Sequence, residues 1–237
     1  MHEKTGLKRN AVVFLIISIC LGFGTAISPA QADEKREAVQ LLEKTRLMFD
    51  GVMADKNFKA FHDLLKKAEA ILLVPQLLKG AFVVGVSGGS GVLLVRDKET
   101  GKWNGPAFYT IGEASWGLQI GGLASEVVML AMTQRGVTAL LSHSLKLGGD
   151  VGVAAGPIGA GAEAATANLS VDILSFSRSK GLYGGISFEG AAVAVRDGLN
   201  ESFYGQKVSP TDIFIRHKAV KAEAAPLVEA VTKAAKR

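Results

Sequence analysis

The sequence predicts an α+β fold in which N-terminal amphipathic helices pack on a glycine-rich, mainly antiparallel β core. Residues 34–69 carry apolar side chains at helical spacing, which predicts helices there. Most of the remaining chain consists of short aliphatic runs separated by glycine, which is typical of strands and turns. Because 48% of the 237 residues are hydrophobic and 21% are charged, the composition is that of a globular chain with a sizeable core.

One stretch of the β region occurs twice. Residues 79–97 read KGAFVVGVSGGSGVLLVRD, and residues 180–197 read KGLYGGISFEGAAVAVRD. In both copies a Lys-Gly pair opens an aliphatic run, a cluster of Ser and Gly interrupts it, and a second run ends in Arg-Asp. We therefore expect a duplicated hairpin, with each turn at the Ser and Gly cluster, within one sheet system and not in a repeat array.

Two helices are expected at the start of the fold. Residues 34–53 place Ala38, Leu42 and Phe49 on one face, with basic residues elsewhere around the turn. A second helix begins after Asp55, which suits an N-cap, and its polar face is rich in lysine.

The positions of proline and glycine and the spacing of the apolar residues predict the later helices and strands. A short strand or buried turn is expected to end at Pro75, because proline interrupts a helix and biases the preceding residue towards extended geometry. The remaining expectations are a turn at 103–106, strands at 107–111 and 114–121, a strand or helix at 126–133, a helix at 134–144, packed strand and turn at 148–167, a short helix at 200–205, and a strand at 212–215.

The first 32 residues have the parts of a secretory signal. Lys8 and Arg9 precede an apolar run at 11–27, and Ala30-Gln31-Ala32 suits cleavage, although an uncleaved anchor is the alternative. We expect a signal peptide at 1–32, a domain at 33–217 and a basic helical or frayed tail at 218–237. The expected location is therefore outside the cytoplasm, periplasmic or extracellular, peripheral to a membrane.

The number of cysteines and the net charge restrict the bonds and the partners that the mature chain can have. The single cysteine, Cys20, lies in the leader, so the mature chain has no disulfide framework. The leader contains Lys4, Lys8, Arg9 and Glu3, so its removal lowers the formal net charge from +5 to +3. A charge this small does not indicate nucleic acid as a partner.

Motifs for catalysis are weak. Gly85-Val86-Ser87-Gly88-Gly89 matches the nucleophile elbow of hydrolases, which needs a helix after the serine, but a strand-like run follows. The histidines His62, His143 and His217 lack metal-binding spacing. We expect no enzymatic activity, no cofactor and no metal.

Two interpretations of the basic helices remain open. Their apolar faces can enter the interface of an anionic bilayer while lysine and arginine meet the headgroups. Alternatively, the apolar faces cover the sheet and the charges are solvated, and the residues alone favour this second interpretation.

A series of short motifs runs in order along the mature chain. It includes Ala70-Ile71-Leu72 before Pro75, Lys79-Gly80-Ala81-Phe82, Gly89-Ser90-Gly91-Val92, Trp103 with Pro106, Gly117-Leu118-Gln119-Ile120-Gly121, Ala155-Gly156-Pro157, Gly181-Leu182-Tyr183-Gly184-Gly185 and Phe203-Tyr204-Gly205. This series resembles the SYLF domain family, one branch of which is described as an actin-binding domain. The resemblance covers residues from about 38 to 215.

The resemblance implies a non-catalytic lipid-binding module. Eukaryotic members bind phosphoinositides through a basic amphipathic segment at the start of the domain, and some fungal members bind actin. By position that segment corresponds to residues 34–69, and the implied lipid-binding residues are Lys35, Arg36, Lys44, Arg46, Lys56, Lys59, Lys66 and Lys67.

Export changes the expected ligand. An exported protein meets neither actin nor, normally, phosphoinositides, so we expect an anionic phospholipid membrane, with phosphatidylglycerol or cardiolipin as the ligand. Shallow insertion of Met48, Phe49 or Phe58 would follow electrostatic docking. The alternative is a structural or protein-partner-binding envelope protein without lipid affinity, whose partner is unknown.

Overall fold

A computed structural model describes residues 29–81, 84–116, 121–157, 171–179, 182–184 and 188–236. The chain divides into two compact units, Met1–Asp33 and Glu34–Arg237. Apart from the first turn of α2 (Pro29–Ala54), every described element belongs to the second unit.

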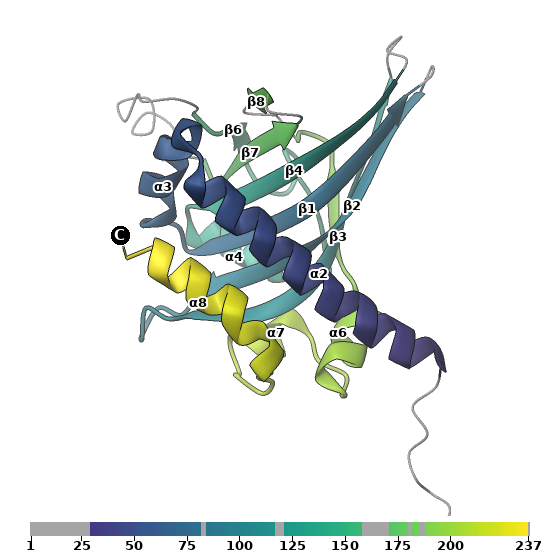
Figure 1. Cartoon of the computed structure of the whole chain (residues 1–237), viewed down its shortest axis with the longest axis vertical. Coiled ribbons are helices and arrows are strands. Elements are labelled where there is room, and N and C mark those ends of the chain that lie inside the picture. The colour runs from purple at the N-terminus through teal and green to yellow at the C-terminus, as the bar shows by residue number, and fades with distance from the viewer. Residues whose placement is uncertain are drawn as a thin grey trace, which may run out of the picture. The chain divides into compact units, whose positions relative to one another are not determined.

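The described strands form one mainly antiparallel nine-stranded sheet, which confirms the predicted fold class (Figure 1). The strand order is β5-β9-β3-β2-β1-β4-β7-β6, and β8 pairs with β7. Only the β6 and β7 pair is parallel. The strands are β1 (Ala70–Ala81), β2 (Val84–Arg96), β3 (Trp103–Trp116), β4 (Gly121–Ala131), β5 (Ser144–Lys146), β6 (Val153–Ala155), β7 (Ile173–Ser179), β8 (Leu182–Gly184) and β9 (Ala192–Val195).

The predicted duplicated hairpin is wrong. In the first copy the chain reverses between Ala81 and Val84, and the Ser and Gly cluster lies in the middle of β2. There Ser87 pairs with Lys79 of β1 and with Glu113 of β3. In the second copy β8 pairs with β7, whereas β9 pairs with β3 and β5, so its two halves do not pair with each other.

The glycines of β2 serve close packing instead of a turn. The pairing of β1 with β2 shifts register between Leu73 and Gln76, around Pro75, which has no N–H to donate to the ladder. A Cβ atom at Gly89 would lie 2.4 Å from the carbonyl oxygen of Gln76, and one at Gly91 would lie 2.9 Å from that of Leu73. Both positions therefore require glycine so that β2 can approach the irregular part of β1.

Several other predicted elements are also wrong. The strand expected to end at Pro75 continues to Ala81, and the strands expected at 107–111 and 114–121 share one strand, β3, up to Trp116. The expected turn at 103–106 is part of β3, where a cis peptide bond joins Gly105 to Pro106. Residues 212–215 fall mostly in a helix, α7 (Pro210–Phe214), because Ser209 and Asp212 form a capping box at its start. The packed region expected at 148–167 contains β6, and residues 158–170 lie outside the described ones.

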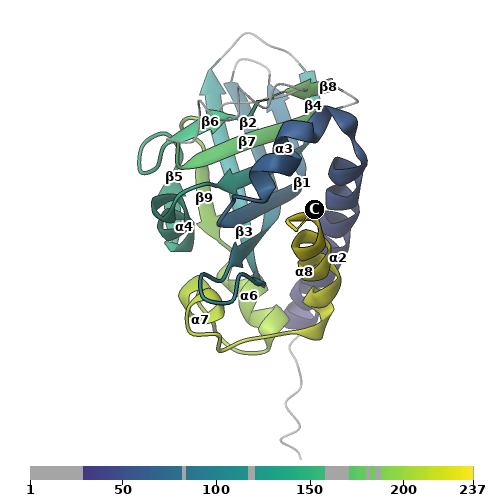
Figure 2. The ribbon, with the colours of Figure 1, turned by 90° about the vertical axis from the view of Figure 1, so that its left-hand side faces the viewer.

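The helices cover the sheet as the α+β prediction requires. Figure 2 shows α2, α3 (Lys59–Leu65) and α8 (Ala225–Ala234) on one side of it and α4 (Gln134–Leu141) on another. Between α2 and α3 lies the short 3-10 helix η1 (Lys56–Phe58), and α6 (Asp197–Tyr204) and η2 (Ala222–Ala224) complete the described helices.

Aromatic side chains join these layers. The ring centroid of Phe61 in α3 lies 5.4 Å from that of Phe176 in β7, and Phe108 of β3 lies 5.2 Å from Phe203 of α6. Leu227 and Val231 of α8 are buried in the same core, so the helical part of the expected tail covers the sheet instead of standing in solvent.

Candidate functional site

The segment from η1 through α3 separates its apolar and basic residues. Asp55 caps η1 by accepting a hydrogen bond from the backbone N–H of Asn57 at 2.9 Å. Helical spacing then buries Phe61 and Leu64 against the sheet. Four exposed lysines lie on this segment and on the turn that follows α3, and they are called the lysine face: Lys56, Lys59, Lys66 and Lys67.

Most of the lysine face is available to an external anion. Lys66 Nζ lies 3.0 Å from Asp63 Oδ1, and this hydrogen bond lowers the pKa of Asp63. Among the described residues, Lys56, Lys59 and Lys67 make no ion pair. Four lysines and one aspartate give this face a net positive charge.

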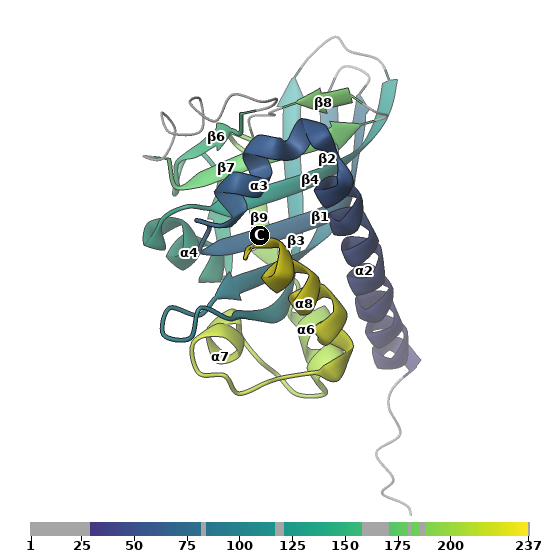
Figure 3. The same ribbon diagram turned by 60° about the vertical axis from the view of Figure 1, so that its left-hand side comes forward.

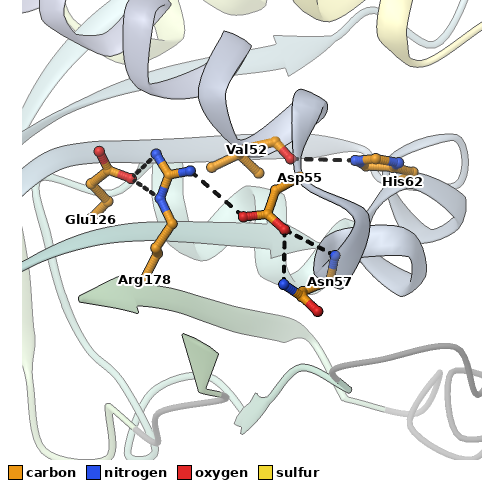
Figure 4. A network of polar contacts seen from close by, with 6 residues as sticks. All are labelled: Val52, Asp55, Asn57, His62, Glu126 and Arg178. Atoms are coloured by element: carbon orange, nitrogen blue, oxygen red, sulfur yellow. Dashed lines mark hydrogen bonds and ion pairs between the residues drawn. The ribbon is translucent and has the colours of Figure 1, made fainter. Parts of the chain in front are cut away.

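A half-buried polar network fixes the bend between α2 and η1 on the sheet (Figure 4). Arg178 of β7 donates from Nε to Glu126 Oε2 at 2.6 Å, and its Nη1 lies 3.9 Å from Asp55 Oδ2. On the other side of the bend, His62 Nε2 lies 3.4 Å from the carbonyl oxygen of Val52. The start of the lysine face is therefore held by β4 and β7.

Arg96 holds the end of the same face. Its Nη1 donates to the carbonyl oxygen of Lys66 at 2.9 Å, and its Nη2 donates to that of Leu65 at 3.4 Å. Burial lowers the pKa of Arg96, whose guanidinium also lies over the Trp103 ring, 5.0 Å from the ring centroid. A cation suits this position because carbonyl groups at a helix C-terminus are unpaired and carry partial negative charge.

The predicted basic residues of α2 have a different setting. Arg46 lies 3.1 Å from Asp50, whereas Lys35, Arg36 and Lys44 are exposed. Residues 34–53 also contain as many acidic as basic side chains, namely Glu34, Glu37, Glu43 and Asp50 against Lys35, Arg36, Lys44 and Arg46. The eight predicted residues therefore fall into a net basic group, from η1 to the turn after α3, and a balanced group on α2. Figure 3 shows α2 and α3, the helices of the two groups.

The expected insertion of apolar residues from these helices is wrong for the folded chain. Met48, Phe49 and Phe58 are only 4%, 1% and 3% exposed, because they form part of the core beneath the helices. Hydrophobic periodicity identified the correct face of each helix, but that face is bound to the sheet.

Features that would support catalysis are not assembled. Ser87 is buried within β2, which continues through it as a strand, so the nucleophile elbow is not formed. His143 lies 3.5 Å from Asp197, and His217 lies 3.4 Å from Asp97, each far along the chain from Ser87. Within the described ranges, no three His, Asp or Glu side chains are grouped to hold a metal ion. The described helices also include none with the length and apolar character needed to cross a bilayer.

Sequence reasoning did not identify the residues that position the lysine face. Arg96 and Arg178 come from strands, and nothing in their local sequence shows which helix they contact. One feature of the sequence, the repeated Arg-Asp pair, could have pointed to Arg96. Arg196, the arginine of the second copy, also binds an N-terminal helix, through Glu37 of α2.

The chain is similar to known proteins whose names refer to binding and regulation. The family described as "Ysc84: Las17-binding protein actin regulator" matches residues 112–234. Protein YSC84 of Saccharomyces cerevisiae is 32% identical over 213 residues, covering 88% of this chain and 44% of that protein. The human SH3 domain-containing YSC84-like protein 1 is 31% identical over 198 residues, covering 83% of this chain and 57% of that protein.

A further yeast relative, LAS seventeen-binding protein 3, is 35% identical over 147 residues, covering 60% of this chain and 32% of that protein. The chain thus spans between about a third and just over half of the length of these relatives. Because the family match covers more than half of the chain, the chain falls in a class of proteins described by binding and regulation. The chain belongs to the Ysc84 (SYLF) family.

Proposed function

We propose that this protein binds anionic phospholipid surfaces without catalysis, docking through the lysine face while α2 and α3 stay on the sheet. The observation that carries this proposal is the charge separation from η1 to the turn after α3, where three lysines without ion pairs among the described residues stand on a segment fixed from beneath. Each basic side chain near an anionic surface contributes about 1 kcal/mol of binding free energy. Docking in this mode needs no rearrangement of the core.

The ligand follows from the expected location. The leader at 1–32 supports export, and anionic phospholipids such as phosphatidylglycerol or cardiolipin supply the negative surface there. Lys44 of α2 is a further predicted residue that is exposed and without an ion pair among the described residues, and it extends the contact.

Charge reversal tests the surface. Replacing all four residues of the lysine face by glutamate is expected to weaken binding to vesicles of phosphatidylglycerol and phosphatidylcholine about a thousandfold, as measured by co-sedimentation. The matched control changes net charge equally at exposed lysines elsewhere, through glutamate at Lys102, Lys146, Lys207 and Lys236, and is expected to keep most of the binding. Equal losses in the two variants would show that the lysine face has no special role.

A second candidate function is binding of a protein partner. It is favoured by the relatives' names, since two of them are named for SH3 domains or for LAS seventeen binding. A wild-type protein that does not sediment with anionic vesicles would favour this second function over the first.

A further inference from the structure

The end of the sheet formed by β1 to β4 carries exposed apolar residues that the lysine face does not use. Figure 1 shows these four strands running together past α2 at one end. Leu78, Val86 and Leu123 there are 55%, 60% and 42% exposed, and they are three of the seven large exposed hydrophobic residues in the described part of the chain. The sheet end comprises residues 77–81 of β1, 84–88 of β2, 112–116 of β3 and 121–125 of β4.

Strand register shows which side chains share a face. Leu78 pairs with Gly88 and with Ala124, and Val86 pairs with Gly80 and with Ala114. Side chains directly opposite one another, and those two residues apart on one strand, point to the same face. Leu78 and Val86 therefore stand on one face, and the positions next to them on this face are glycine or alanine: Gly80, Gly88, Gly112, Ala114, Gly122 and Ala124.

The opposite face is also partly apolar. Leu123 pairs with Lys79, so these two side chains share the second face. Residues 77–88 contain one charged side chain, Lys79, and residues 112–125 contain one, Glu113. Both pair with Ser87 and therefore lie on this second face, and no charged residue of these ranges falls on the first face.

A cation borders the first face. A groove of about 290 Å³ separates the sheet end from α2, and its walls include Leu78 and Gly88 on the sheet and both Lys44 and Glu37, the latter paired with Arg196, on the helix. An apolar surface bordered by a lysine fits the boundary between acyl chains and anionic headgroups, where apolar atoms enter the membrane and the ammonium group stays at its surface.

We propose that the sheet end enters the interfacial layer of the same anionic membrane that the lysine face docks on. This inference rests on the proposed function. A folded partner or a second copy would cover one face of the strands, whereas apolar residues exposed on both faces suit entry of the strand ends into an apolar phase. Figures 2 and 3 show the bend between α2 and α3 towards this end of the sheet, whereas Arg96, at the other end of β2, binds the end of α3.

Backbone pairing limits the depth of entry. At the sheet end β1 has partners on both sides, and so has β2, so their N–H and C=O groups are satisfied. The paired stretches of β3 with β9 and of β4 with β7 end at Gly112 and Glu126, so the outer edges of β3 and β4 lack strand partners beyond these residues in the described part of the chain. Because unpaired backbone groups are costly in hydrocarbon, insertion is shallow.

Depth measurement with single labels tests the proposal. In a Cys20→Ser background, Val86→Cys carries an environment-sensitive fluorophore, and Val220→Cys, an apolar site that is 83% exposed elsewhere, is the control. With anionic vesicles that contain a lipid-bound quencher, the label at position 86 is expected to shift to the blue and to be quenched, and the label at position 220 is expected to stay in water. Sedimentation is measured on the same samples.

The outcomes separate this inference from the proposed function. Protein that sediments while the label at position 86 remains in water overturns entry of the sheet end and leaves docking through the lysine face intact. Protein that does not sediment overturns both.

Loss of the apolar side chains gives a second test. The triple variant Leu78→Ser, Val86→Ser and Leu123→Ser is expected to lower partitioning into anionic vesicles about tenfold, whereas Val220→Ser leaves it unchanged. A lipid-free dimer that the triple variant dissociates would instead assign the sheet end to self-association. Should the triple variant fail to fold, the labelled single variants decide the question.

Discussion

Asp172 shows how one buried carboxylate joins three parts of the fold. It accepts hydrogen bonds from Thr133 Oγ1 at 2.6 Å, from Arg135 Nε at 2.8 Å and from the backbone N–H of Gly152 at 3.1 Å. Burial raises the pKa of Asp172, but the hydrogen bonds from Thr133, Gly152 and Arg135 outweigh it and lower the pKa below its usual value of 3.8. The ionised form is therefore the one that the fold stabilises.

The pH dependence of stability follows from this shift. A carboxylate whose pKa is lower in the folded state stabilises the fold above its unfolded pKa, and this contribution is lost as pH falls through the folded pKa. We expect Asp172→Asn to lower the free energy of unfolding by about 2 kcal/mol at neutral pH. The difference from wild type should shrink as pH falls below 3.8, as measured by urea unfolding at several pH values. A difference that stays constant over this range would contradict the assignment.

At the scale of elements, three arginines attach the N-terminal helices to the sheet. Arg96 binds the end of α3 and Arg178 binds the bend before η1. Arg196 forms an ion pair with Glu37 of α2 and donates to Ser90 Oγ of β2 at 3.0 Å. The helices that carry the predicted lipid-binding residues are therefore fixed at several points.

This attachment predicts how a weakened contact affects binding. Arg196→Ala is expected to reduce the free energy of unfolding by about 1 kcal/mol, because the ion pair is only partly buried. Hydrogen exchange should become faster in residues 34–44 and remain unchanged in α3. Vesicle binding should also remain unchanged, since docking occurs with the helices in place. Stronger vesicle binding by Arg196→Ala would show that membrane contact requires release of α2.

The elements also show what could be predicted from sequence. Helical periodicity at 34–69 identified both helices and their buried faces, because 3.6-residue spacing is a local property. The hairpin turn was misplaced because the Ser and Gly cluster around Gly89 resembles a turn, whereas its glycines are set by the approach of β1, a contact made by another strand. The helix at 210–214 could have been found from the capping pair Ser209 and Asp212.

At the scale of the whole molecule, the candidate site was only partly predictable. The four residues of the lysine face were among those expected, and their charge separation follows from helical spacing. The sheet end was not expected, because the exposure of Leu78 and Val86 depends on where α2 stops covering the strands. The sequence also could not show that Met48 and Phe49 are held by the core.

The two surfaces give the molecule a combined mode of contact in the proposed function. The lysine face supplies electrostatic attraction, which depends on the charge of the lipid and is screened by salt. The sheet end supplies apolar contact, which salt does not screen in this way. The electrostatic attraction of the lysine face should therefore control whether the protein reaches the membrane.

The most direct test is the partition coefficient of the wild-type protein between water and vesicles, compared for anionic and neutral lipid at low and high salt. The Debye length is about 10 Å at 0.1 M salt and about 3 Å at 1 M. We predict strong partitioning into phosphatidylglycerol vesicles at low salt, a large loss at high salt, and little partitioning into phosphatidylcholine at either. Equal partitioning into both lipids, or no partitioning into anionic vesicles at low salt, would contradict the proposed function.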